Sequence, residues 1–185
     1  QITNNLDDIS SCNIFIVTVP TPIDKNKDPD FKPLLDVCKK ISKLLKKGDI
    51  VIFESTVYPG ATEEICAKEL EKNKSSLKSG VDFFLGYSPE RVNPGDKKRT
   101  IDKINKVISG QNKKVETILF DIYSKLTKGE IFLAKNIKVA EASKVIENAQ
   151  RDINIAFINE VAKICSKLNI SIYDVLDASN TKWNF

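Results

Sequence analysis

Histidine and methionine are absent from this sequence of 185 residues, and only three of its 29 cationic residues are arginine. Without imidazole, the chain cannot form a Ser-His-Asp triad, a Cys-His dyad or a histidine metal site. The 29 Lys and Arg exceed the 25 Asp and Glu by only 4 charges. Nucleic-acid readers usually concentrate arginine in a basic patch, so we expect no nucleic-acid partner.

Long apolar runs and closely spaced cysteines are missing as well. No run approaches the ~20 residues that cross a bilayer, so we expect no membrane partner and a cytoplasmic protein. The four cysteines, Cys12, Cys38, Cys66 and Cys165, form no C-x-x-C pair. That spacing argues against a thiolate metal site, and we expect no metal. Buried free thiols in a reducing compartment are the expected alternative.

Neither an initiating methionine nor a secretion signal precedes Gln1. Such a chain is either a processed product or a piece of a longer protein, and we take the second as our hypothesis. Apolar residues make up 41% of the chain, which is enough for a sizeable core.

Apolar runs in the first part of the chain predict buried strands. Residues 14–19, 50–53 and 81–87 form runs without regular apolar–polar alternation, which is typical of strands buried on both faces of a parallel sheet. Shorter candidates cover residues 106–109 and 130–133.

Helical periodicity separates these runs. Apolar residues repeat at spacings of three and four over residues 34–45 and 115–122, and Thr62 can cap a third helix between them. Alternation of strands and helices from about residue 14 to about residue 134 predicts an α/β domain with parallel strands.

The pattern changes near residue 136. Residues 137–168 contain no glycine or proline and have helical periodicity, and about 32 residues at ~1.5 Å each make a helix too long for a sheet crossover. A short helix near Ser171 follows. We therefore predict an α/β domain over residues 1–135 and a helical domain over residues 136–185. The apolar stripe of the long helix is either core or subunit interface.

Three polar turns follow the three main predicted strands. They are V-T-V-P-T-P-I-D at 17–24, E-S-T-V-Y-P-G-A-T-E-E at 54–64 and G-Y-S-P-E-R-V-N-P-G-D at 86–96. Because α/β folds bind ligands at the carboxyl ends of parallel strands, three such turns predict a binding site. The alternative is that proline-rich turns simply end the strands.

A fourth motif lies on the long helix, over residues 141–160. Lys144 and Asn148 are four residues apart, so both project from one helix face and can reach one ligand atom. Arg151 follows three residues later. Taken alone, Lys144 also suits a solvated surface lysine.

Together, these four motifs resemble the UDP-glucose/GDP-mannose dehydrogenase family, and within it the bacterial UDP-N-acetylhexosamine 6-dehydrogenases of capsule and O-antigen pathways. The resemblance runs along the whole chain. It implies the second half of a Rossmann-like cofactor domain, followed by the long helix that begins an all-α dimerisation domain. It also places the G-x-G-x-x-G loop and the nucleophilic cysteine outside these residues, so we expect the 185 residues alone to be inactive.

The activity implied by the resemblance is oxidation of the C6 alcohol of a UDP-N-acetylhexosamine to a carboxylate, with two NAD consumed per turnover. UDP-glucose enzymes have an acidic residue four positions after Glu90, where this chain has Pro94. The difference favours UDP-GlcNAc or UDP-GalNAc. UDP-N-acetylmannosamine and UDP-glucose are the alternative substrates, and a non-catalytic interaction or dimerisation module is the alternative class.

The resemblance also assigns roles to individual residues and implies a homodimer formed through the long helix. Thr56 and Glu90 resemble the pair that holds and activates the water attacking a thioester. Lys144 and Asn148 resemble the pair that stabilises negative charge on O6. The expected NAD site comprises Val17, Thr18, Val19, Pro20, Thr21, Ser55, Thr56 and Val57. The expected substrate site comprises Glu90, Arg91, Val92, Asn93, Lys144, Asn148 and Arg151.

Overall fold

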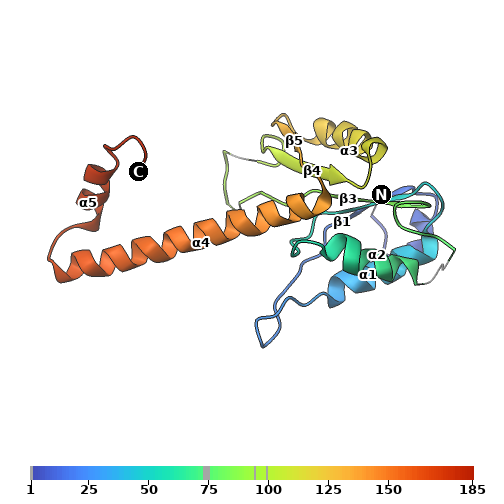
Figure 1. Cartoon of the computed structure of the whole chain (residues 1–185), viewed down its shortest axis with the longest axis horizontal. Coiled ribbons are helices and arrows are strands. Elements are labelled where there is room, and N and C mark those ends of the chain that lie inside the picture. Colours follow the sequence, from blue (N-terminus) through green and yellow to red (C-terminus); the bar gives the residue numbers. More distant parts are fainter. Residues whose placement is uncertain (1, 73–75, 94, 99) are drawn as a thin grey trace. The chain divides into compact units, whose positions relative to one another are not determined.

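A computed structural model describes residues 2–72, 76–93, 95–98 and 100–185 (Figure 1). The chain divides into two packing units, residues 1–145 and 146–185. The strands are β1 (Ile14–Val17), β2 (Ile50–Phe53), β3 (Phe84–Tyr87), β4 (Lys106–Gly110) and β5 (Ile131–Leu133). The helices are α1 (Lys32–Leu44), α2 (Ala67–Glu71), α3 (Lys113–Leu126), α4 (Ile137–Lys167) and α5 (Ile172–Ser179). A short 3-10 helix (Leu6–Ile9) and a π-helical segment (Thr62–Cys66) complete the elements.

The first unit contains a five-stranded sheet in the order β1-β2-β3-β4-β5. Parallel pairing is confirmed for β1, β2 and β3 and for β4 with β5. The β3–β4 pair differs, because Gly86 and Tyr87 lie antiparallel to Gly110 and Ser109. The described residues between these two strands form no helix, and an antiparallel pair, unlike a parallel one, does not need a crossover helix.

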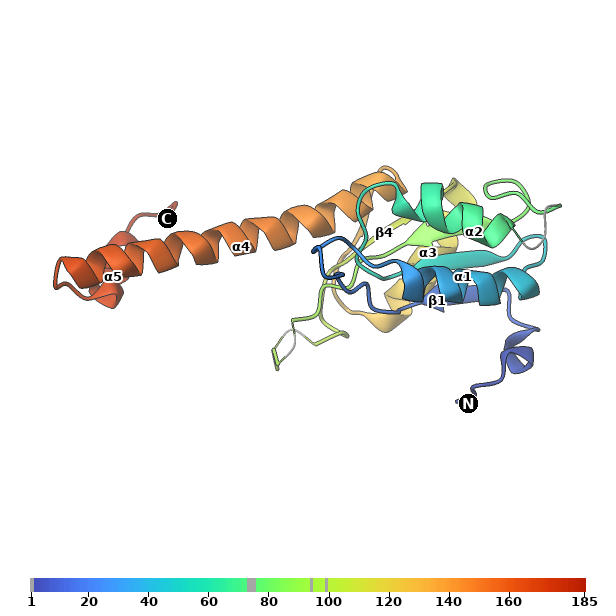
Figure 2. The same ribbon diagram turned by 90° about the horizontal axis from the view of Figure 1, so that it is seen from below.

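Strand β2 is buried on both faces, which explains its unbroken apolar run. Val51 and Phe53 belong to the core beneath α1 and α2, whereas Ile50 and Ile52 pack with α3 on the opposite face. Figure 2 shows α1 and α2 together on one side of the sheet. The alternation places one core on each side of the sheet and leaves its carboxyl edge for the turns.

Two predicted elements, the third strand and the helix after Gly60, differ from the prediction at their first residues. The third strand starts at Phe84, because the chain turns at Gly80, whose φ is +79°, and leaves Val81 74% exposed. Thr62 does not cap its helix with its side chain: among the described residues, its buried hydroxyl has no hydrogen-bond partner. The backbone there continues through the π-helical segment into α2.

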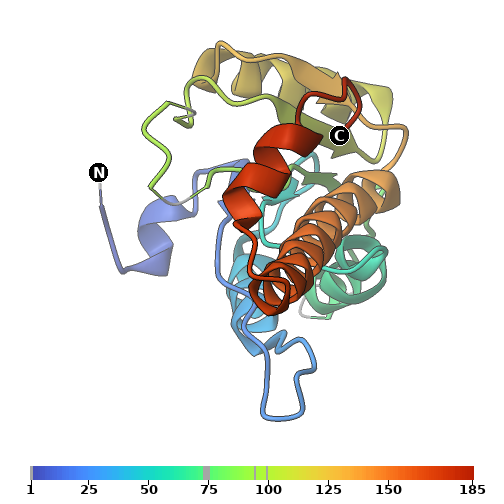
Figure 3. The same ribbon diagram turned by 90° about the vertical axis from the view of Figure 1, so that its left-hand side faces the viewer.

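The long helix and the short helix after it match the predicted elements. Helix α4 has 31 residues, and Ser171 Oγ accepts a hydrogen bond of 3.3 Å from the Asp174 amide at the start of α5. Figure 3 shows the chain turning back between these helices. The expected domain boundary at residue 136 lies at the start of α4, whereas the packing units divide between residues 145 and 146. That domain boundary stays a prediction.

All four cysteines are free, and only three of them are buried as expected. Cys12 is exposed, because it lies in the loop that precedes β1 rather than in the strand. None of the described helices is both long and apolar enough to span a membrane.

Two buried tyrosines predict that the free energy of unfolding falls at alkaline pH. Tyr87 on β3 and Tyr123 on α3 are 0% and 1% exposed, and burial raises the pKa of both phenols above the ordinary 10.0. Between that value and the higher folded pKa, the unfolded state loses phenolic protons that the folded state retains. We expect the free energy of unfolding to decline above about pH 10, by about 1.4 kcal/mol per pH unit for each tyrosine.

Urea unfolding of the complete protein at a series of pH values measures this slope. Tyr87→Phe or Tyr123→Phe should flatten it, and Tyr173→Phe is the matched control because Tyr173 is 76% exposed. A slope that neither core substitution changes would contradict the assignment.

Candidate functional site

The turns after β1 and β2 are joined by two hydrogen bonds. Thr21 Oγ1 donates to the Thr56 carbonyl over 2.6 Å, and Ser55 Oγ donates to the Val19 carbonyl over 2.5 Å. Both turns leave the carboxyl ends of neighbouring parallel strands. The structure therefore brings the expected cofactor residues of the two turns together at one edge of the sheet.

Exposure divides these turn residues into those that support the edge and those that a ligand can reach. Val17, Ser55 and Val57 are buried. Val19 and Thr21 are half-buried, and Thr18, Pro20 and Thr56 are exposed. Thr18 and Thr56 are thus within reach of a ligand, while the buried residues support the backbone that carries them.

The third turn lies beside the second, because the Ser88 amide donates to the Phe53 carbonyl over 3.0 Å. Glu90 is half-buried, and its Oε1 accepts a 2.6 Å hydrogen bond from the Val92 amide. This local bond fixes the Glu90 carboxylate close to its own backbone.

The remainder of the third turn contacts the segment that precedes β4. Arg91 Nη1 donates to the Asn105 carbonyl over 3.2 Å, and Asn93 is exposed. Pro94, which carries the expected preference for N-acetylated sugars, lies outside the described residues.

A buried charged cluster that the sequence did not indicate supports the turn of Ser55 and Thr56. Tyr123 Oη donates to Glu54 Oε1 over 2.5 Å, and Lys106 Nζ lies 3.7 Å from the same oxygen. The side chains of Lys106 and Glu54 are only 6% and 14% exposed. The cluster ties β4 and α3 to the end of β2. The sequence features that could have indicated it are Lys106 at the first position of an apolar strand and Glu54 directly after another.

Glu90 lies near this cluster. Burial is the largest cause of the raised pKa of Tyr123, followed by the charge and hydrogen bond of Glu54. The negative charge of Glu90 also raises this pKa. The third turn therefore shares the electrostatic environment of the Glu54 carboxylate at the edge of the sheet.

The first turns of α4 are attached to the second turn by Glu141, another residue to which the sequence analysis gave no role. Its carboxylate is fully buried and accepts hydrogen bonds from the amides of Gly60 (2.5 Å) and Thr62 (2.9 Å). The available signal was its place in the motif A-E-A-S-K, three residues before Lys144.

The expected residues of α4 fall in both packing units. Lys144 is half-buried in the first unit. Asn148 and Arg151 are exposed in the second, where Arg151 Nη1 donates to Asn148 Oδ1 over 3.5 Å. Their expected approach to Glu90 and the substrate stays a prediction.

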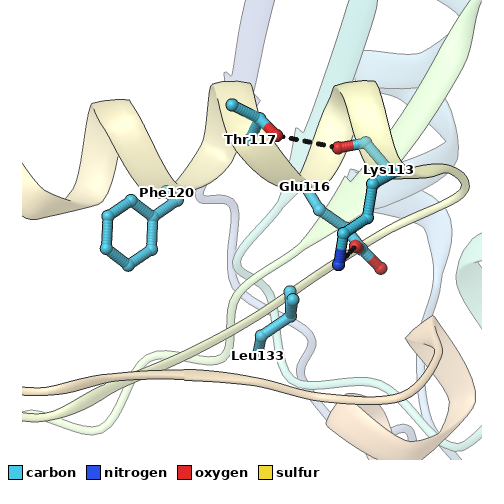
Figure 4. A pocket seen from close by; sticks show the side chains of 5 residues that line it. All are labelled: Lys113, Glu116, Thr117, Phe120 and Leu133. Atoms are coloured by element: carbon cyan, nitrogen blue, oxygen red, sulfur yellow. Dashed lines mark hydrogen bonds and ion pairs between the residues drawn. The ribbon is translucent and has the colours of Figure 1, made fainter.

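A hollow on the surface lies elsewhere, between α3 and β5 (Figure 4). Lys113 Nζ lies 3.3 Å from Glu116 Oε2 on its rim, and Thr117 Oγ1 donates to the Lys113 carbonyl over 3.0 Å. Phe120 and Leu133 supply its apolar side chains. None of these five lining residues belongs to the expected site, and β5 is the edge strand farthest from β1 in the sheet order.

Comparison with known proteins matches two parts of the chain separately. Residues 1–127 match the NAD binding domain of the UDP-glucose/GDP-mannose dehydrogenase family, and residues 138–185 match the central domain of the same family.

Individual relatives agree with these matches. The chain is 55% identical to the UDP-N-acetyl-D-glucosamine 6-dehydrogenase of Pseudomonas aeruginosa and 52% identical to Protein CapL of Staphylococcus aureus, over all 185 residues in both cases. The solved structure of a UDP-D-ManNAc dehydrogenase from Pyrococcus horikoshii superimposes with a TM-score of 0.90 at 34% identity, over 99% of this chain and 43% of that one. The chain spans 44% and 43% of the lengths of the first two relatives. It belongs to the UDP-glucose/GDP-mannose dehydrogenase family.

Proposed function

We propose that this chain is part of an NAD-dependent dehydrogenase that oxidises the C6 alcohol of a UDP-N-acetylhexosamine to a carboxylate. The observation that carries the proposal is similarity over the whole chain to a UDP-N-acetyl-D-glucosamine 6-dehydrogenase, with 55% identity. The joined polar turns at the carboxyl edge of β1 and β2 support it, because α/β dehydrogenases bind their cofactor and substrate at such an edge. UDP-GlcNAc and UDP-GalNAc are the substrates we favour, for polysaccharide synthesis.

The residues at this edge suit part of an NAD site. Thr18 and Thr56 are exposed at this edge, and hydrogen bonds from Ser55 and Thr21 hold the backbone carbonyls of Val19 and Thr56 in place. Bound NAD would supply the hydride acceptor for oxidation at C6. The residues that would hold it are Val17, Thr18, Val19, Pro20, Thr21, Ser55, Thr56 and Val57.

The chemistry of the chain's own residues concerns one proton and one developing charge. Glu90 is the general base that takes a proton from water, and the Thr56 hydroxyl orients that water. The Lys144 ammonium and the Asn148 amide donate to the negative charge that develops on O6. Arg91, Val92, Asn93 and Arg151 complete the contacts to the sugar and its diphosphate.

A second copy of the chain is the partner we propose for α4. Ile146 and Ile153 are seven residues apart on this helix, and both are 66% exposed. Residues at this spacing lie on one helical face, and burying such side chains would stabilise a homodimer. Three buried free cysteines agree with the reducing cytoplasm as its location.

NADH formation by the complete protein tests the proposed activity. We expect two NADH per sugar with UDP-GlcNAc or UDP-GalNAc, measured by absorbance in a panel that includes UDP-N-acetylmannosamine and UDP-glucose. A higher kcat/KM with either of the last two would select that alternative substrate. No NADH with any sugar would favour an interaction module.

Replacing the proposed base separates the two halves of the reaction. Glu90→Gln keeps the shape of the side chain and removes its ability to accept a proton, so water attack should slow by about 10²–10⁴. We expect a covalent sugar–enzyme intermediate to accumulate and to be visible by mass spectrometry of the complete protein. Glu130→Gln, at an exposed glutamate, is the control. Turnover of Glu90→Gln at the wild-type rate, with no trapped intermediate, would remove Glu90 from this role.

Replacing the proposed oxyanion donor tests whether Lys144 acts in the transition state. Lys144→Ala should lower kcat by about 10²-fold and change KM much less, because the lost donor matters most when O6 is charged. Lys163→Ala removes an exposed lysine from the same helix and is the matched control. A variant with a raised KM and an unchanged kcat would show that Lys144 only binds the ground state.

A further inference from the structure

We propose that Glu141 is a positioning residue of this site, fixing the turn that carries Thr56 against the helix that carries Lys144. The inference rests on the proposed function, because Thr56 and Lys144 are assigned their roles there. Glu141 itself contacts backbone amides and has no role as proton donor or acceptor.

The energetic argument begins with the burial of the carboxylate. Glu141 has an exposed fraction of 0%, and a buried carboxylate is costly unless hydrogen bonds compensate for lost hydration. Each of its oxygens accepts one backbone N–H, from Thr62 to Oε1 and from Gly60 to Oε2. Hydrogen bonds to a charged acceptor are about twice as strong as neutral ones. Removal of the carboxylate would leave two buried donors without their partner.

The position of these donors adds a second stabilising term. Gly60 and Thr62 lie where the chain enters the helical run of Thr62–Cys66 and α2. The first amides of a helix have no partner within the helix and form the positive end of its dipole. Glu141 accepts hydrogen bonds from these amides although it lies 81 residues after Gly60 and 79 residues after Thr62 in the sequence. A long-range contact replaces the local cap that Thr62 does not supply.

Only short stretches of chain separate this contact from both proposed catalytic groups. Gly60 follows Thr56 by four residues, and Glu141 precedes Lys144 by three residues, which is almost one turn of α4. The turn also approaches α4 closely: a Cβ at Gly60 would lie 3.3 Å from Lys138 Cε on that helix. The φ of +99° at Gly60 adds to this constraint. Movement of the Glu141 carboxylate would therefore change the spacing between Thr56 and Lys144.

A second contact between the same two segments provides a matched control. Lys138 Nζ lies 2.6 Å from Glu64 Oε1, and these side chains are 53% and 58% exposed. Exposed ion pairs contribute little to stability, because water and salt screen both charges. The two contacts thus differ mainly in burial and in the backbone groups that Glu141 holds.

Steady-state kinetics of Glu141→Gln and Glu64→Gln in the complete protein tests the proposal. The glutamine has one acceptor oxygen, and its NH2 group would face a backbone N–H, so the turn must shift. We expect kcat for NADH formation to drop by about 10²-fold, the scale of a 1 Å misplacement, with a much smaller change in the KM for the nucleotide sugar. Glu64→Gln should stay within about twofold of wild type in both parameters.

Thermal unfolding and Glu141→Asp distinguish positioning from a merely structural role. Aspartate keeps the negative charge, but its side chain is one methylene shorter, so the carboxylate lies farther from the two amides. We therefore expect a folded protein with kcat lowered by about 10-fold. Wild-type kcat per folded molecule in Glu141→Gln, even with a lower unfolding temperature, would overturn the proposal. If that variant does not fold, wild-type kcat in folded Glu141→Asp would overturn it equally. A wild-type protein that forms no NADH refutes the proposed function instead, and the positioning role falls with it.

Discussion

A buried carboxylate joins the α/β sheet to the long helix in this protein. Glu141 on α4 accepts hydrogen bonds from the amides of Gly60 and Thr62, and this contact is buried, whereas the Lys138–Glu64 ion pair between the same segments is exposed. Burial makes this contact sensitive to geometry, since an ion removed from water must keep all its hydrogen bonds. Through it, the start of α4 is fixed to the turn after β2 by two hydrogen bonds, and the proposed site depends on this contact.

Sheet topology supplies the other half of the site. Strands β1, β2 and β3 are parallel, so the three polar turns leave the sheet at the same edge. Hydrogen bonds of Thr21 and Ser55 then hold neighbouring turns together. Below that edge, Glu54 and Lys106 bury opposite charges near Tyr123. The accessible groups can remain polar and exposed because buried residues fix the backbone beneath them.

Much of this organisation could be predicted from the sequence, because strong local patterns determine it. The apolar run at β2 and the unbroken helical periodicity of α4 both appear where expected. The antiparallel β3–β4 pair was not predicted, since single-strand patterns carry no direction. Glu141 also escaped prediction: its partners lie about 80 residues away, and its role depends on backbone amides that every sequence contains. The same reasoning led to Thr62 as a local cap, although a distant carboxylate supplies that function.

Amide hydrogen exchange at Gly60 and Thr62 in the complete wild-type protein tests the central claim most directly. At the start of a helix these amides would exchange rapidly with solvent unless an acceptor outside the helix protected them. The buried bonds to Glu141 predict slow exchange at both positions, comparable to amides in the core strands. Exchange of either amide at the rate of an unstructured peptide would contradict the account, because Glu141 would then not hold the turn.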